Sequence, residues 1–182
     1  ELARRVGLSP GVAGVEVNLA WPPGSAACRD SYQAGKVIGA VRRDMPRGVP
    51  VLAKIAPDVH HVVDVARAVV KAGAVVVVVG HGLPGLALDR ETLRPALGSG
   101  SGALSGPAVH AVALNCIWEV HEALPEVQLV GGGGVRSGFD ALAMLAAGAR
   151  AVQVGTTVLR DPGAPGRIVS ELRQELDRRN IA

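Results

Sequence analysis

Aromatic residues and cysteines are scarce in this sequence, and each shortage excludes a class of protein. Only 2% of the 182 residues are Phe, Trp or Tyr, so small aliphatic side chains must build the core. The two cysteines, Cys28 and Cys116, are too few for the disulfide framework of a small secreted domain. Thiols without such a framework suit a reducing compartment, which predicts a cytoplasmic protein.

Long apolar runs and clusters of metal ligands are missing as well. The chain has no run of about 18 apolar residues and no signal-peptide pattern, so we expect a soluble protein with no membrane partner. No cluster of His, Cys and carboxylates has metal-ligand spacing, so no metal is expected, and His110 and His121 are expected to be solvated. The net charge is only +3 and no stripe mixes basic with aromatic residues, which argues against a nucleic-acid partner.

The residues that are abundant alternate between strand and helix patterns. Hydrophobic residues make up 48% of the chain, and its length allows one domain over residues 1–182. Apolar runs that end at turn residues predict strands at 11–19, 51–56, 74–79, 127–135 and 151–156. Helices are expected at 29–44, at 59–72 with Asp58 as cap, from Ser105 to Leu124, after the capping residue Ser137, and at 165–179. Residues 80–106 show no clear periodicity and are expected to form a long irregular segment.

Regular alternation of strands and helices predicts an α/β fold with a parallel sheet. A closed (β/α)8 TIM barrel needs eight strands and commonly about 250 residues. Because three strands are missing, we interpret the chain as the C-terminal five strands of such a barrel, with the N-terminal strands absent from this chain. The first residues then resemble the end of a helix. An open, doubly wound sheet of five strands is the alternative.

Two strands that end in glycine stand out as a candidate anion site. The first runs into Gly131–Gly134, and the second ends at Gly155 and Thr156. Glycine lets the backbone turn tightly and lets its N–H groups approach an anion, and the last two strands of a barrel are the usual place for a phosphate. The pair predicts a phosphate-binding site. Two ordinary tight turns are the alternative.

Two polar residues at strand ends are candidates for chemistry. Lys54 lies inside an apolar strand, where its ammonium needs a partner or an opening, and it could stabilise negative charge on a ligand. A lysine that reaches solvent from an edge strand is the alternative. His81 follows the valine-rich strand and is a candidate base, although a hydrogen-bonded structural histidine is equally open. Cys116 falls on an apolar helix stripe and is expected in the core, whereas Cys28 could be a reactive thiol.

Five motifs in register resemble the dihydroorotate dehydrogenases, most closely the class 1 branch that includes a bacterial catalytic subunit. They are Val15-Glu-Val-Asn18, Pro50-Val-Leu-Ala-Lys54, Leu104-Ser-Gly-Pro-Ala108, Gly131-Gly-Gly-Gly-Val135 and Ala151-Val-Gln-Val-Gly-Thr156. The resemblance covers about residues 11–175. It implies a (β/α)8 barrel that binds FMN and oxidises dihydroorotate to orotate in pyrimidine biosynthesis. It also implies a homo-oligomer, with an electron-transfer subunit as a further partner.

The resemblance also implies roles for individual residues. Asn18 and Lys54 would contact FMN, and Asn18 would also contact the substrate. Gly80 and Gly106 would line the flavin, and His81 and Gly82 would lie at the substrate. The phosphate of FMN would be held by Gly133, Gly134, Gly155 and Thr156.

The motif after the first strand departs from the family pattern. Trp21 occupies the position of the catalytic base, and Pro23 replaces an asparagine that would bind substrate. An indole nitrogen only donates hydrogen bonds and cannot accept a proton at neutral pH. The catalytic residue therefore stays unknown, and His81 is a hypothesis for it. Two alternatives are a phosphate-binding barrel enzyme without flavin and a degenerate or truncated flavin-binding subunit.

Overall fold

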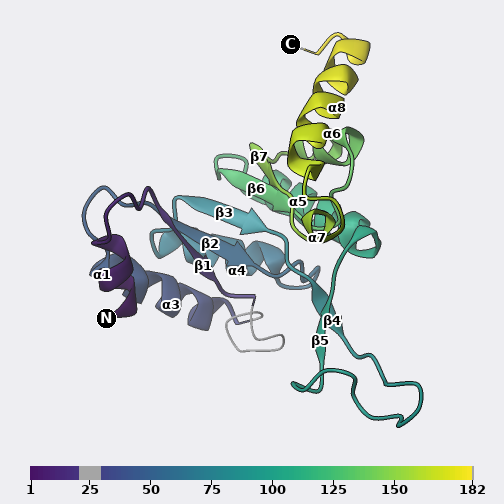
Figure 1. Ribbon diagram of the computed structural model, residues 1–182. Coiled ribbons are helices and arrows are strands. Elements are labelled where there is room, and N and C mark those ends of the chain that lie inside the picture. The colour runs from purple at the N-terminus through teal and green to yellow at the C-terminus, as the bar shows by residue number, and fades with distance from the viewer. Residues whose placement is uncertain (21–29, 182) are drawn as a thin grey trace.

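The computed structural model describes residues 1–20 and 30–181 and contains a five-stranded parallel sheet (Figure 1). Its strands lie in the order β1-β2-β3-β6-β7, which is also their order along the chain. Their bounds are Val15–Asn18, Val51–Ile55, Val76–Val79, Leu129–Gly132 and Ala151–Gln153. The five strands predicted from the sequence are thus confirmed, each somewhat shorter than expected.

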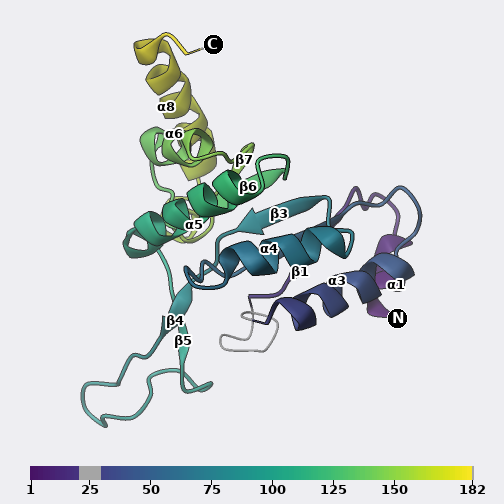
Figure 2. The ribbon, with the colours of Figure 1, turned by 180° about the vertical axis from the view of Figure 1, so that it is seen from behind.

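The strand order decides between a barrel and an open sheet. A doubly wound sheet reverses its strand order at a switch point and carries helices on both faces. Here each strand pairs with the one before it in the sheet without any reversal. Helices α3 (Ser31–Asp44), α4 (Val62–Lys71) and α5 (His110–Ala123) all cover the same face, as Figure 2 shows. The sheet is therefore part of a barrel, as predicted, and the doubly wound alternative is wrong.

Capping side chains explain where two of the helices begin. Asp30 caps α3 by accepting hydrogen bonds from the backbone N–H groups of Tyr32 and Gln33. Ser137 caps α6 (Gly138–Ala146) by accepting from the N–H of Asp140, which confirms the predicted cap.

The start of α4 differs from the prediction. We expected a helix from residue 59 capped by Asp58, but α4 begins three residues later with His61 at the cap position. The Asp58 carboxylate instead accepts from the N–H of His60 and lies 3.2 Å from the His61 ring, so it stabilises the turn that precedes the helix.

The hydrophobic core lies between the sheet and these helices. In β2 the side chains of Val51, Ala53 and Ile55 are buried, while Leu52 and Lys54 are half-buried on the opposite face. This alternation places one set against the helices and the other toward the barrel interior. The helices contribute buried aliphatic side chains, among them Ile38, Val65, Val69, Ala113, Ile117 and Val120.

Cys116 lies in this core, as predicted. Its side chain is fully buried on α5. Burial raises the pKa of the Cys116 thiol to about 12, and the nearby carboxylates of Glu119 and Asp58 add to the shift. The thiol therefore acts as a small apolar group rather than a nucleophile.

The segment from residue 80 to 106 forms an arm. It contains two short antiparallel strands, β4 (Leu83–Gly85) and β5 (Gly102–Leu104), and projects away from the main sheet (Figure 1). The prediction of an irregular segment is therefore wrong in part. The strands escaped notice because three residues are too few to show a period of two.

Four short or peripheral elements complete the part of the fold that the structure describes. They are α1 (Leu2–Gly7), the 3-10 helix η1 (Pro107–Val109), α7 (Thr156–Arg160) and α8 (Ala164–Arg179). Within the described ranges, no helix is both long and apolar enough to cross a membrane.

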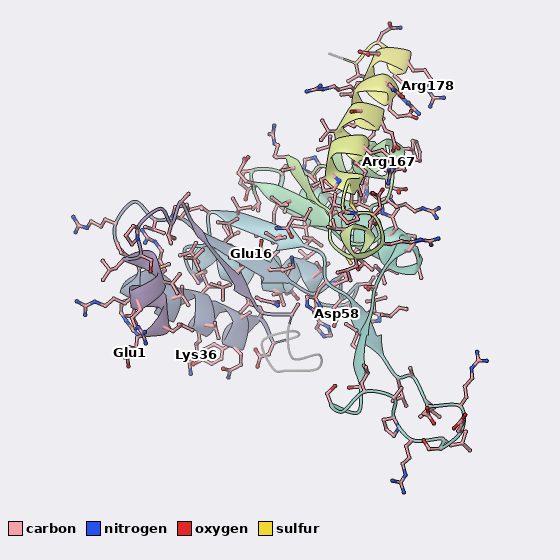
Figure 3. The ribbon with its side chains drawn as sticks, viewed as in Figure 1. Glu1, Glu16, Lys36, Asp58, Arg167 and Arg178 are labelled. Carbon is pink, nitrogen blue, oxygen red and sulfur yellow. The ribbon has the colours of Figure 1, made fainter. Side chains whose placement is uncertain are left out.

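Three arginines of α8, Arg167, Arg178 and Arg179, are held in ion pairs. Arg167 contacts the carboxylates of both Asp161 and Glu171. Two hydrogen bonds hold the pKa of Glu171 below its usual value. The larger effect comes from Arg167 and the smaller from the N–H of Gly138. Arg178 likewise pairs with Glu175. Figure 3 shows Arg167 and Arg178 along this helix.

Candidate functional site

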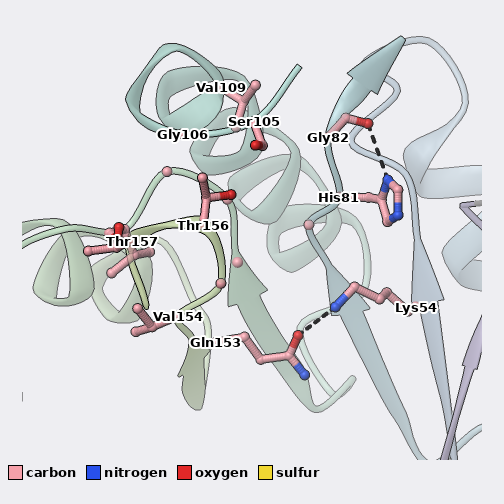
Figure 4. Close-up of a pocket in the computed structure, with 16 residues that line it drawn as sticks. Lys54, His81, Gly82, Ser105, Gly106, Val109, Gln153, Val154, Thr156 and Thr157 are labelled. Atoms are coloured by element: carbon pink, nitrogen blue, oxygen red, sulfur yellow. Dashed lines mark hydrogen bonds between the residues drawn. The ribbon is translucent and has the colours of Figure 1, made fainter. Parts of the chain in front are cut away.

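A pocket of about 430 Å³ opens at the carboxyl ends of the strands (Figure 4). Its lining comes from β2 and from the segments that follow β3, β5, β6 and β7. The described lining residues are Lys54, Gly80, His81, Gly82, Ser105, Gly106, Val109, Gly132, Gly133, Gly134, Val135, Gln153, Val154, Gly155, Thr156 and Thr157. None of these is acidic, so the pocket suits an anionic ligand.

Gly80 lines the pocket directly after the end of β3. It has a φ of +150°, and a Cβ at this position would lie 2.2 Å from the carbonyl oxygen of Gly132. Only glycine lets the ends of β3 and β6 approach so closely.

The loop after β6 turns at Gly133 and Gly134, which have φ values of +110° and +70°. A Cβ on Gly134 would lie 2.8 Å from both the carbonyl oxygen of Gly106 and the Cβ of His110. The loop is therefore packed tightly against the start of α5. Among the described residues, no atom lies within 4 Å of the place where a Cβ on Gly106 would be, so its backbone borders open space.

His110 fastens this loop, contrary to the expectation that it is solvated. Its Nδ1 atom lies 3.1 Å from the carbonyl oxygen of Gly133, and its Nε2 atom lies 3.9 Å from Asp140. The side chain of His110 is 18% exposed. His121 is also half-buried, against Gly148. The sequence missed both contacts because each connects α5 to a glycine turn distant in the sequence.

The loop after β7 is tied to the loop after β6. The hydroxyl of Thr157 donates a hydrogen bond of 2.7 Å to the carbonyl oxygen of Val135. Gly155 precedes α7, and no atom of the described ranges lies within 4 Å of the place where its Cβ would be. Thr156 and Ser105 line the same side of the pocket (Figure 4). The two glycine-ended strands therefore end in one connected surface beside open space.

Lys54 belongs to a closed network of three side chains. Its Nζ atom donates a 2.7 Å hydrogen bond to Oε1 of Gln153 and lies 3.2 Å from Oε1 of Glu16. The Nε2 atom of Gln153 donates a 2.7 Å hydrogen bond to Oε2 of Glu16. These residues come from β2, β7 and β1, so the network connects the two outermost strands across the open face of the sheet. The alternative of a solvent-reaching lysine is wrong, because the Lys54 side chain is only 20% exposed.

His81 lines the pocket directly after β3. Its Nδ1 atom lies 3.3 Å from the carbonyl oxygen of Gly82, which favours the tautomer with hydrogen on Nδ1. Figure 4 shows the imidazole on the same side of the pocket as Lys54.

Asn18 is the described site residue that does not line this pocket. It ends β1 next to Lys54 in the sheet register, and its side chain accepts a hydrogen bond from the N–H of Ala20. Trp21, Pro23 and Cys28 lie outside the described residues. The eight other residues predicted to bind cofactor or substrate from the resemblance, beside Lys54, all border the pocket or its rim: Gly80, His81, Gly82, Gly106, Gly133, Gly134, Gly155 and Thr156.

Gln153 and Glu16 are polar site residues to which the sequence analysis assigned no role. Each is flanked by aliphatic residues within its strand. The same pattern drew attention to Lys54 in the sequence. Within the described ranges, no group of three His, Cys, Asp or Glu side chains could hold a metal ion. The pocket therefore offers an ammonium group, backbone N–H donors and hydroxyl groups, which together suit an anionic ligand.

The fold and the pocket define a class of protein: a parallel β/α barrel with a pocket at the carboxyl ends of its strands, lined by a lysine and glycine-rich loops. A family model described as "Dihydroorotate dehydrogenase" matches residues 1–176. The chain therefore belongs to the dihydroorotate dehydrogenase family, whose members are flavin-dependent oxidoreductases that act on CH–CH groups.

Two curated relatives illustrate this similarity. The "Dihydroorotate dehydrogenase B (NAD(+)), catalytic subunit" of Geobacter sulfurreducens is 40% identical over 186 aligned residues, covering 100% of this chain and 60% of that protein. The protein of the same name from Desulforudis audaxviator is 38% identical, covering 99% of this chain and 59% of that protein. The chain thus spans about 60% of the length of these relatives.

Solved structures show the same fold. A ligand-free DHODH from Eimeria tenella superimposes with a TM-score of 0.75 at 23% identity, over 98% of this chain and 56% of that one. The complex of the Eimeria enzyme with ferulenol gives a TM-score of 0.73, covering 93% of this chain and 51% of that chain. At this identity the comparison shows the fold alone, and it agrees with the barrel predicted from the sequence.

Proposed function

We propose that this chain supplies the FMN-binding part of an oxidoreductase of the dihydroorotate dehydrogenase type. The observation that carries the proposal is the meeting of Lys54, His81 and both glycine-ended loops around one pocket without acidic lining in the described part of the chain. The pocket volume lies in the range of small-ligand sites.

The residues present fit FMN at both ends of the pocket. Gly133, Gly134, Gly155 and Thr156 would hold the phosphate, since their backbone borders one connected concave surface with two hydroxyls nearby. At the other side, the Lys54 ammonium would stabilise negative charge on the ring. When bound, FMN supplies the acceptor for a hydride from the substrate.

Membership of the family suggests dihydroorotate as the substrate, yet the residue at the position of the catalytic base is changed. Its oxidation to orotate releases a hydride and a proton, and the proton needs a base. Trp21 stands at the position of that base and cannot accept the proton. We therefore propose His81 as the base for the substrate of this protein, because its imidazole lines the pocket directly after β3, on the same side as Lys54.

The names of the relatives suggest a route for the electrons. They describe the catalytic subunit of an enzyme that uses NAD(+). We propose that electrons from the flavin pass to a separate electron-transfer subunit in this protein too. A homo-oligomer of the catalytic chain, predicted from the resemblance, belongs to the same proposal.

The decisive experiment is to purify the full-length gene product and record its flavin absorbance, then add dihydroorotate anaerobically. Bound FMN that is bleached supports the complete proposal. Bound FMN that dihydroorotate does not bleach supports another substrate or a degenerate flavin-binding subunit. A colourless protein that stays colourless after FMN addition contradicts the proposal and favours a flavin-free, phosphate-binding barrel enzyme.

Two substitutions separate the roles of the bases. Trp21→Cys should create or raise turnover of dihydroorotate if only the base has been lost. His81→Gln keeps a polar side chain of similar size but removes the titratable nitrogen. Flavin reduction that is unchanged in His81→Gln, with whichever substrate reduces the parent, would rule out His81 as base.

A further inference from the structure

The network around Lys54 contains two residues with no role in the function proposed so far. Gln153 lies on β7 and lines the pocket, whereas Glu16 lies on β1 and does not border it. Figure 3 shows Glu16 over the open face of the sheet. Both contact the Lys54 ammonium, and both lie far from it in the sequence.

The amide of Gln153 has the chemistry that its position requires. It accepts a hydrogen bond from a cation with Oε1 and donates one to an anion with Nε2, both at 2.7 Å. A carboxylate could not donate to Glu16, and an aliphatic side chain could do neither. The charges of its two neighbours also determine which way the amide points, because the flipped amide would face the ammonium with its NH2 group.

The network also determines where the Lys54 ammonium points. An ammonium has three N–H donors. Within the described part of the chain, Gln153 and Glu16 take two of them, which leaves the third for a ligand in the pocket. The side chains of Lys54 and Glu16 are 20% and 30% exposed, so solvent screens this pair less than a pair on an open surface.

We propose that Gln153 and Glu16 are positioning residues that hold the Lys54 ammonium toward the ring of the bound cofactor and set the net charge beside it. This inference rests on the proposed FMN site. Gln153 determines the direction of the ammonium, and Glu16 offsets part of its charge. Lys54 itself makes the contact with the ligand.

A double-mutant cycle tests the positioning role in the full-length protein. Gln153→Leu should weaken FMN binding about tenfold when Lys54 is present, as expected for a lost hydrogen bond to a charged group. In a Lys54→Met background the same change should cost less than about twofold, because no ammonium remains to be positioned. Equal losses in the two backgrounds, or no loss in either, would overturn the inference.

The midpoint potential of bound FMN is a second readout. If Gln153 and Glu16 had only a structural role, substitutions of them would not shift this potential in opposite directions. Reduction adds negative charge to the ring, so the potential follows the charge nearby. Glu16→Gln removes an offsetting carboxylate and should raise the potential. Gln153→Glu adds a carboxylate and should lower it. Shifts of the same sign in both variants would contradict the inference.

Urea unfolding of the ligand-free proteins separates this inference from the proposed function. The effects of Gln153→Leu and Lys54→Met on unfolding should be non-additive, since the two side chains are in contact. If the parent binds no FMN, the proposed function fails. Additive effects on unfolding would overturn the inference whether or not FMN binds.

Discussion

The Nδ1 atom of His110 lies 3.1 Å from the carbonyl oxygen of Gly133, and this contact ties the first turn of α5 to the loop after β6. The loop carries two consecutive glycines with positive φ. Residues with a side chain rarely adopt this backbone conformation. The imidazole therefore stabilises the geometry that the proposed phosphate site needs.

Removing this contact should weaken phosphate binding. His110→Ala frees the carbonyl of Gly133, and we expect FMN to bind roughly three- to tenfold more weakly, as for the loss of one neutral hydrogen bond. Fluorescence quenching of FMN on titration with protein measures the change. His110→Asn is the matched control, because its amide can still donate to the carbonyl. Equal affinity for His110→Ala and the parent would show that the contact does not shape the site.

Gly134 should tolerate no side chain. Gly134→Ala places a methyl group 2.8 Å from the carbonyl oxygen of Gly106 at a φ of +70°, and we expect a loss of roughly 1–3 kcal/mol in the free energy of unfolding. Gly166→Ala is the control in helix α8, because no described atom lies within 4 Å of the added methyl group. This substitution should stabilise the folded protein by up to about 1 kcal/mol. Chemical denaturation of both variants measures the difference. A stable Gly134→Ala protein would mean that this turn is not as tightly packed as described.

The Cys116 thiol should be unreactive toward alkylation in the folded protein. Its raised pKa should also lower the stability of the fold as the pH becomes alkaline. Its pKa is raised to about 12 from the ordinary thiol value of 9.0, mainly by burial. The folded state therefore keeps the proton more tightly than the unfolded state, so this stabilisation is complete below pH 9.0 and is lost as the pH rises toward 12.

Two measurements check this prediction in a Cys28→Ser background, which leaves Cys116 as the single thiol. Iodoacetamide should modify Cys116 in denaturant and leave it unmodified in the native protein at pH 8. Cys116→Ala should lose less stability than its parent between pH 9 and pH 11. Rapid alkylation of the native protein would show that α5 is not packed as described.

The edges of the sheet predict how the 182-residue chain behaves by itself. β1 and β7 are the outermost strands, and a strand with an unpaired edge promotes association. We expect residues 1–182 expressed alone to self-associate, and the full-length gene product to remain dispersed because further strands would cover both edges. Light scattering after size-exclusion chromatography compares the two. A monodisperse, monomeric 182-residue chain would contradict the expectation.

Much of the fold was predictable because its signals are local. The valine-rich strand that ends at Val79 is a short unbroken apolar run, and the apolar stripe of α5 repeats at helical spacing. Glycines at the ends of β6 and β7 marked the pocket for the same reason. Short elements such as β4 were missed because they have too few residues to show a period.

Local patterns were thus enough to predict the five strands of the main sheet, the longer helices and most of the strand-end residues that line the pocket. The partners of Lys54 became visible only in the folded chain. Lys54 and Gln153 are 99 residues apart, and Gln153 and Glu16 are 137 apart. Contacts over such separations depend on the curvature and register of the whole sheet, which no local pattern encodes. The same curvature converts polar side chains scattered over three strands into one charged network beside the pocket.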